Sequence, residues 1–125
     1  MLRHEFIRRK LRLIAEDLER IVMRAIDINE HLISELSAGD GKTTRLTYRD
    51  TFLLLADLGV YTQDFAEQIA RSAGLRNILV HDYNDVDRKI VHGSIKSCLQ
   101  DYHRYLELIG SFLDRFGEQR GDGDR

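Results

Sequence analysis

Four polar side chains that could do chemistry lie within eight residues around the end of an apolar helical pattern: Arg76, Asn77, His81 and Tyr83. An imidazole titrates close to neutral pH and can therefore take up or release a proton during a reaction. A guanidinium can bind two oxygens of a phosphate at once. Arg76 and His81 are five residues apart, about 140° around an α-helix, so an uninterrupted helix would not bring them together. We expect either that the helix ends at His81 or that a second copy of the chain completes the site.

For an arbitrary protein, a purely structural interpretation of these residues is the simpler one. Arg76 would then pair with a neighbouring carboxylate, and His81 would cap the C-terminus of its helix. Three aspartates follow the histidine and could in principle be ligands of a hard cation, but their spacing matches no known calcium loop. They are Asp82, Asp85 and Asp87. We therefore expect neither a metal ion nor another cofactor.

The order Arg-x-x-x-x-His-x-Tyr, with Asn77 directly after the arginine, resembles the signature of the HEPN superfamily, and specifically of HepT-like ribonuclease toxins. Other segments are similar to HepT segments and occur in the family's order: residues 27–32, 48–52 and 73–77. The resemblance extends from about Ile21 to the end of the last predicted helix. The chain departs from the family near its N-terminus, where HepT proteins usually place two helices joined by a loop.

The resemblance implies a metal-independent endoribonuclease that acts as the toxin of a bacterial toxin–antitoxin pair. Arg76 would hold the scissile phosphate, and His81 would take the ribose 2′-hydroxyl proton or protonate the leaving oxygen. Asn77 would orient the histidine or a ribose hydroxyl, and the product would be a 2′,3′-cyclic phosphate. A MntA-like nucleotidyltransferase antitoxin would attach AMP to Tyr83, and the bulky anionic group would block the path of the RNA.

Two further residues in the resembling region, Asp27 and His31, are four positions apart on one helical face. We treat them as secondary site candidates and prefer to interpret them as a surface pair. Two other function classes stay open: a catalytically inactive HEPN-type binding module and a structural helical oligomer. The intact set of Arg76, His81 and Tyr83 favours the ribonuclease, because an inactive site has no chemical need of that combination.

The chain has 125 residues, of which 42% are hydrophobic and none is proline, so it is long enough for one domain and too short for two. A net charge of −2 and a pI near 6.2 indicate that any contact with RNA must come from a local patch. The single cysteine, Cys98, has no partner for a disulfide or a zinc site, and we expect it to be buried. With no apparent signal peptide or membrane span, the sequence predicts a cytoplasmic protein.

The hydrophobic pattern predicts an all-α, HEPN-like helical bundle of two long heptad-patterned helices and two short ones, spanning residues 1–117. We expect residues 118–125 to form a disordered tail, because they contain no apolar residue. The two long helices are expected to pair along their heptad stripes. These stripes consist of Ile7, Leu11, Ile14, Leu18, Ile21, Ala25, Ile28 and Leu32 in the first, and Val91, Ile95, Cys98, Tyr102, Tyr105, Ile109, Phe112 and Phe116 in the second.

Local signals bound the short helices: Thr47 and Asp50 resemble a capping box, Gly59 closes that helix, and Thr62 caps a helix that carries the motif. Small residues from Ala66 to Gly74 would let another helix approach closely. We therefore expect a homodimer whose motif helices lie near the interface, with the long helices as a second possible interface. The first turns hold five basic residues, which we interpret as a solvated face, with RNA contact as the alternative. They are Arg3, Arg8, Arg9, Lys10 and Arg12.

Overall fold

The computed structural model describes residues 3–37, 46–75 and 88–119, with the side chains of residues 93–117 in the last range. Its helices are α1 (His4–Leu36), α2 (Tyr48–Asp57), α3 (Gln63–Ala70) and α5 (Arg88–Gln119). Residues 72–75 are helical again after a turn at Arg71. The described ranges contain only helices, which confirms the predicted all-α class. The last helix continues two residues into the segment predicted to be a tail.

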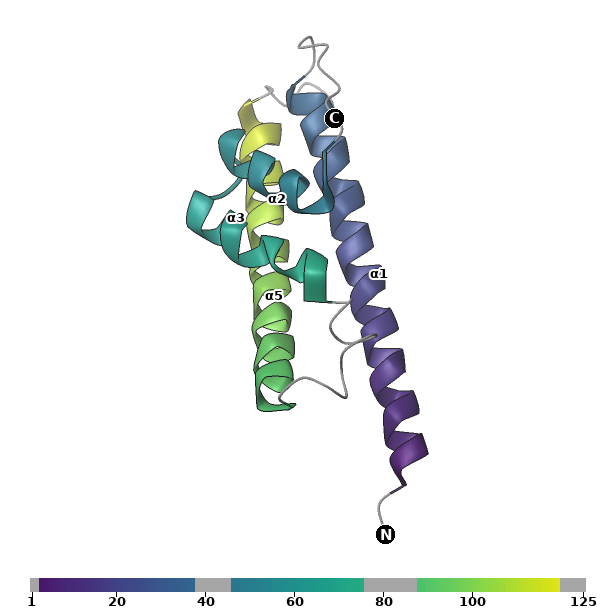
Figure 1. Cartoon of the computed structure of the whole chain (residues 1–125). Helices are drawn as coiled ribbons and strands as arrows, with labels where there is room; N and C mark the ends of the chain where they lie inside the picture. Colours follow the sequence, from purple (N-terminus) through teal and green to yellow (C-terminus); the bar gives the residue numbers. More distant parts are fainter. Residues whose placement is uncertain (1–2, 38–45, 76–87, 120–125) are drawn as a thin grey trace.

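The helices pack in chain order: α1 lies on α2, α2 on α3, and α3 on α5. Figure 1 shows that the two long helices, α1 and α5, run in the same direction and that α2 and α3 lie at one end of them. The N-terminal ends of α1 and α5 therefore point toward the same end of the molecule, opposite α2 and α3. The prediction that the two long helices pair along their heptad stripes is wrong over most of their length, because α1 packs mainly on α2 and α5 packs on α3. The long helices do meet where Tyr105 contacts Ala25 and Asn29.

The predicted caps of the short helices are present. The Asp50 amide donates to Thr47 Oγ1 at 3.1 Å, and the Thr47 amide donates to Asp50 Oδ2 at 3.1 Å, which completes a capping box. The Phe65 amide donates to Thr62 Oγ1 at 3.2 Å at the start of α3. Gly59 has a φ of +84°, a conformation that glycine adopts without strain. The sequence thus predicted both ends of α2 and the beginning of α3.

A buried polar chain joins α1, α2 and α5. The Tyr105 hydroxyl donates to Asn29 Oδ1 at 2.6 Å and lies 3.2 Å from the Ala25 carbonyl oxygen. The Asn29 amide group donates to Thr51 Oγ1 at 3.1 Å, and that hydroxyl donates to the Tyr48 carbonyl oxygen at 2.8 Å. Because Asn29 and Thr51 are fully buried, each of these bonds replaces one that water would otherwise supply.

The stripe predicted for α5 is confirmed in its middle, since Cys98, Tyr102, Tyr105 and Ile109 are buried, while Ile95, Phe112 and Phe116 are partly buried. The stripe predicted for α1 is wrong at every second position. Its four isoleucines, at positions 7, 14, 21 and 28, are between 39 and 44% exposed. The side of α1 that faces the core is instead formed by Ala15, Leu18, Val22, Ala25, Ile26, Asn29 and Leu32. The isoleucines are left uncovered because α1 packs on a short helix and not along a second long one.

Candidate active site

The motif residues Arg76, Asn77, His81 and Tyr83 all lie outside the described residues, so their geometry stays a prediction. The chain is described up to Leu75 on one side of the motif and from Arg88 on the other. Leu75 is buried and belongs to the hydrophobic core. The core therefore fixes the chain at the residue directly before Arg76.

The helix that leads to the motif is interrupted, whereas the sequence predicted a continuous one. Helix α3 ends at Ala70, and the next backbone bonds span three residues, from the Arg71 amide to the Gln68 carbonyl and from the Gly74 amide to the Arg71 carbonyl. The Ser72 hydroxyl donates to the Ile69 carbonyl oxygen at 2.7 Å. Serine favours such breaks because its hydroxyl competes for backbone hydrogen bonds.

The same serine attaches this break to α5. Ser72 Oγ and the Tyr102 hydroxyl are 2.7 Å apart, and both residues are buried. Because the Ser72 hydroxyl donates its proton to the Ile69 carbonyl oxygen, the Tyr102 hydroxyl is the donor in its hydrogen bond with Ser72 Oγ. Burial raises the pKa of Tyr102, with the Ser72 hydrogen bond acting in the opposite direction, so the phenol stays protonated and can donate at neutral pH. This contact positions residues 72–75, which directly precede the motif in the chain.

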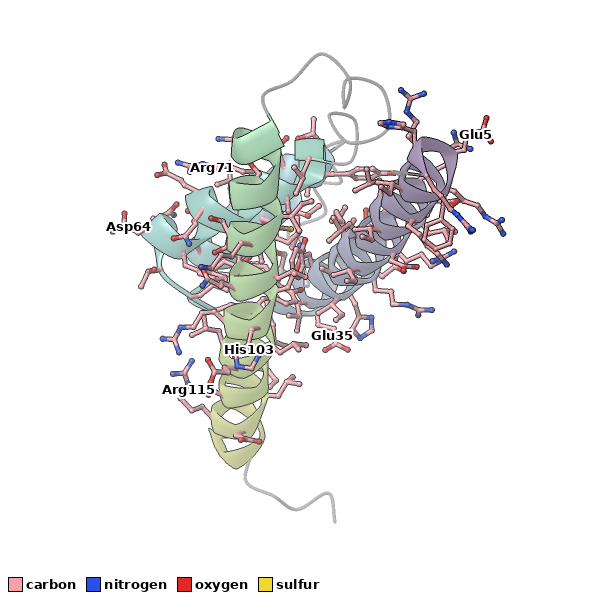
Figure 2. The ribbon with its side chains drawn as sticks, turned by 90° about the horizontal axis from the view of Figure 1, so that it is seen from below. Glu5, Glu35, Asp64, Arg71, His103 and Arg115 are labelled. Carbon is pink, nitrogen blue, oxygen red and sulfur yellow. The ribbon has the colours of Figure 1, made fainter. Side chains whose placement is uncertain are left out.

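A groove of about 910 Å³ lies between α3 and the N-terminal half of α5. Figure 2 shows Arg71 beside that part of α5, with Asp64 near the beginning of α3. The lining is partly polar and includes the last two described residues before the motif. It comprises Asp64, Glu67, Gln68, Arg71, Ser72, Gly74, Leu75, Gly93, Ser94, Ser97, Cys98 and Asp101. The groove therefore opens beside the point where the chain enters the motif.

Several polar residues of this groove were not singled out by the sequence, among them Gln68, Arg71 and Asp101. Gln68 Nε2 donates to Asp101 Oδ1 across the groove at 2.5 Å. Burial raises the pKa of Asp101, while the Gln68 hydrogen bond and the Arg71 charge act to lower it. A pair 33 residues apart leaves no periodic signal in a sequence, so only the packing of α3 on α5 reveals it.

Asp27 and His31 are both exposed on α1 and do not contact each other within the part of the chain that the structure describes. His31 Nε2 instead lies 3.0 Å from Glu35 Oε1, one turn further along the helix. An exposed pair of this kind contributes little to the stability of the fold. The structure thus places Asp27 and His31 on the surface, as preferred, but pairs His31 with Glu35 and not with Asp27. A role for these two residues in the site stays a prediction.

Cys98 is buried, as the sequence predicted, and burial raises the pKa of its thiol to about 11, with the Asp101 charge adding to the effect. It is therefore an unreactive thiol at neutral pH. Among residues 3–37, 46–75 and 93–117, no group of three or more histidine, cysteine or acidic side chains could hold a metal ion. None of the described helices is long and apolar enough to span a membrane.

The chain is similar to known ribonucleases over most of its length. The family model described as Ribonuclease HepT-like matches residues 2–109, so the chain belongs to this family of ribonucleases. This confirms the resemblance drawn from the motif and its flanking segments.

Two curated relatives carry the name HepT. The tRNA nuclease HepT of Aphanizomenon flos-aquae is 39% identical over 102 residues, which cover 82% of this chain and 67% of the relative. The mRNA nuclease HepT of Shewanella oneidensis is 31% identical over 93 residues, covering 74% of this chain and 67% of the relative. In each case about a third of the relative has no counterpart in the match.

Proposed function

We propose that the chain is a metal-independent endoribonuclease and the toxin of a toxin–antitoxin pair. The observation that carries the proposal is the motif Arg76-x4-His81-x-Tyr83 inside the region, residues 2–109, that matches the ribonuclease HepT-like family. In this mechanism Arg76 binds the scissile phosphate and offsets the charge that develops on it. His81 takes the proton of the ribose 2′-hydroxyl or gives a proton to the leaving oxygen. The reaction yields a 2′,3′-cyclic phosphate.

Cleavage of RNA by the purified chain tests this proposal. Wild type should cleave in the presence of EDTA, and both His81→Ala and Arg76→Ala should lower kcat by on the order of 100-fold or more. The matched control is His103→Ala, because His103 is exposed on α5 at a distance from the motif in the chain. Cleavage by His81→Ala at the wild-type rate would refute the assignment. Binding of RNA without any cleavage by wild type would favour the binding module.

The two relatives are named for different substrates, tRNA and mRNA, so either RNA is a candidate for this chain. We infer that a MntA-like nucleotidyltransferase silences the ribonuclease by attaching AMP to Tyr83, two residues after His81. The added phosphate would compete with the RNA backbone for Arg76. Incubation with the antitoxin, ATP and magnesium should increase the intact mass of wild type by one AMP, but not that of Tyr83→Phe. No increase in wild type, or the same increase in the variant, would contradict the proposal.

We further infer a homodimer, for which the exposed isoleucines of α1 offer an interface. Ile7, Ile14, Ile21 and Ile28 are seven residues apart and form one stripe of the kind that pairs with another helix. The interface expected at the small residues before the motif loses support, because Ala66 and Ala70 are buried in the chain's own core.

Sedimentation at tens of micromolar protein tests the dimer. Ile14→Glu should shift wild-type dimer to monomer, because it places a charge in the middle of the stripe. Leu106→Glu is the matched control, since Leu106 is exposed on α5. If wild type is a monomer, the dimer is wrong; if only the control variant dissociates, the interface lies on α5.

A further inference from the structure

The first turns of α1 concentrate positive charge in a chain that is acidic overall. Residues 3–12 contain five arginine or lysine side chains against one glutamate, while the whole chain has a net charge of −2. The remaining residues therefore hold 14 cations against 20 anions. Residues 3–10 are all exposed, and so is Arg12. This end of the helix is a local cationic surface on an anionic molecule.

Three of these cations share one side of the helix. At about 100° per residue, Arg8, Arg9 and Arg12 fall within a sector of about 100°, on the side opposite the isoleucine stripe. We call these three residues the arginine face. Lys10 is not part of it, because its ammonium lies over the ring of Phe6, 5.3 Å from the centroid. An interface on the isoleucine stripe would therefore leave the arginine face open.

The arginine face has no anionic partner among residues 3–37, 46–75 and 93–117. Glu5 is three residues before Arg8, and Glu16 is four residues after Arg12, both at spacings that suit helical ion pairs. Within the ranges that the structure describes, however, no arginine of this face forms an ion pair or side-chain hydrogen bond. Arg8 and Arg12, one turn apart, repel each other by a few tenths of a kcal/mol. An anion bound from outside would relieve that repulsion.

The position of the arginine face relates it to the motif. In both views the beginning of α1 lies at the same end of the molecule as the beginning of α5, and α5 begins with Arg88, the first described residue after the motif. In Figure 2 the labelled Glu5 marks this end, and Arg115 lies at the opposite end of α5. A strand of RNA long enough to pass the motif could therefore also pass the arginine face.

We propose that Arg8, Arg9 and Arg12 bind phosphates of the RNA substrate away from the scissile bond and so guide the strand toward the motif. The inference rests on the proposed ribonuclease function and adds a substrate-binding surface to it. Guanidinium groups suit this task, because they bind phosphate oxygens in pairs and do not lose their charge. A lipid surface fits less well, since a helix held to a membrane by its isoleucine stripe would turn these arginines away from the headgroups.

The test compares two triple variants with equal change in charge. Arg8→Gln/Arg9→Gln/Arg12→Gln removes the arginine face, and Arg49→Gln/Arg104→Gln/Arg115→Gln removes three exposed arginines elsewhere. Both are made in the His81→Ala background, and binding to a fluorescent single-stranded RNA is measured against salt concentration. The slope of log affinity against log salt concentration should become shallower by about 0.7 for each lost phosphate contact. The slope of the first variant should therefore decrease by about 2, and that of the control should hardly change. When salt is lowered from about 1 M to 0.1 M, the parent with an intact arginine face should therefore gain on the order of a hundredfold more affinity than the first variant.

With His81 intact, the arginine-face variant should raise KM for RNA and leave kcat unchanged, since it does not touch the reacting atoms. Equal binding by the two triple variants would overturn the inference, while cleavage by wild type would still support the proposed function. If wild type binds RNA through the arginine face but does not cleave it, the proposed ribonuclease function is wrong and the RNA-binding role of the arginine face is supported. Loss of binding to phosphatidylserine vesicles, with RNA binding unchanged, would show that the arginine face serves a membrane and overturn the inference.

Discussion

The hydroxyl of Tyr105 should be worth a measurable share of the stability of the fold. It is the donor to Asn29 Oδ1 at 2.6 Å and lies 3.2 Å from the Ala25 carbonyl oxygen, and these contacts join α5 to α1. Tyr105 is 2% exposed, and its ring contacts Phe52 edge to face. Tyr105→Phe keeps the ring and its packing and removes only the oxygen atom. The variant therefore isolates the hydrogen bonds from the hydrophobic contacts.

The cost follows from what the substitution leaves behind. Asn29 is fully buried, so water cannot replace the lost donor at its Oδ1 atom. A buried polar group without a partner costs about 1–3 kcal/mol. For a domain of this size, a loss of about 2 kcal/mol corresponds to a fall in Tm of about 6–10 °C. We expect that fall in thermal unfolding followed by circular dichroism, with a matching decrease in the free energy of unfolding from urea titration.

Tyr48→Phe is the matched control, since Tyr48 is 50% exposed and its hydroxyl can bond to water. Its free energy of unfolding should stay within about 0.5 kcal/mol of wild type. A double-mutant cycle with Asn29→Ala gives the coupling between the two partners. Equal effects of Tyr105→Phe and Tyr48→Phe would refute the reasoning, because the buried bond would then contribute nothing.

Three further predictions concern the region next to the motif. Asp101→Asn keeps an acceptor for Gln68 and should stabilise the protein at pH 7; because burial raises the pKa of Asp101 above 3.8, this gain should disappear as the pH falls below 3.8 in urea titrations. Ser72→Ala should lower the free energy of unfolding by about 1–3 kcal/mol and decrease kcat for RNA, because Tyr102 loses its buried partner beside the motif; unchanged stability would contradict this role. Cys98 should resist iodoacetamide at pH 8 in the folded protein and react in urea, as judged by intact mass, because the thiol is buried and its pKa is raised to about 11.

The sequence by itself determined the features that depend on neighbouring residues. The capping box of Thr47 and Asp50, the Thr62 cap and the turn at Gly59 involve groups at most three positions apart or a single backbone angle. The family could also be recognised, because Arg76, His81 and Tyr83 have fixed spacing and characteristic flanks. The roles of these three residues in catalysis stay predictions.

Tertiary structure decided which of two apolar faces of α1 is buried. Both Leu18 and Ile21 fit the heptad pattern, yet only Leu18 faces the core, because the partner of α1 is the short α2. Periodicity shows that a helix has an apolar side but not how much of it a neighbour covers. Tyr105 and Asn29 are separated by 76 positions in the chain, and Ser72 and Tyr102 by 30 positions. Their contacts form only when the helices pack. The arginine face likewise becomes a candidate RNA surface only when the fold leaves it unpaired at the same end of the molecule as the start of α5.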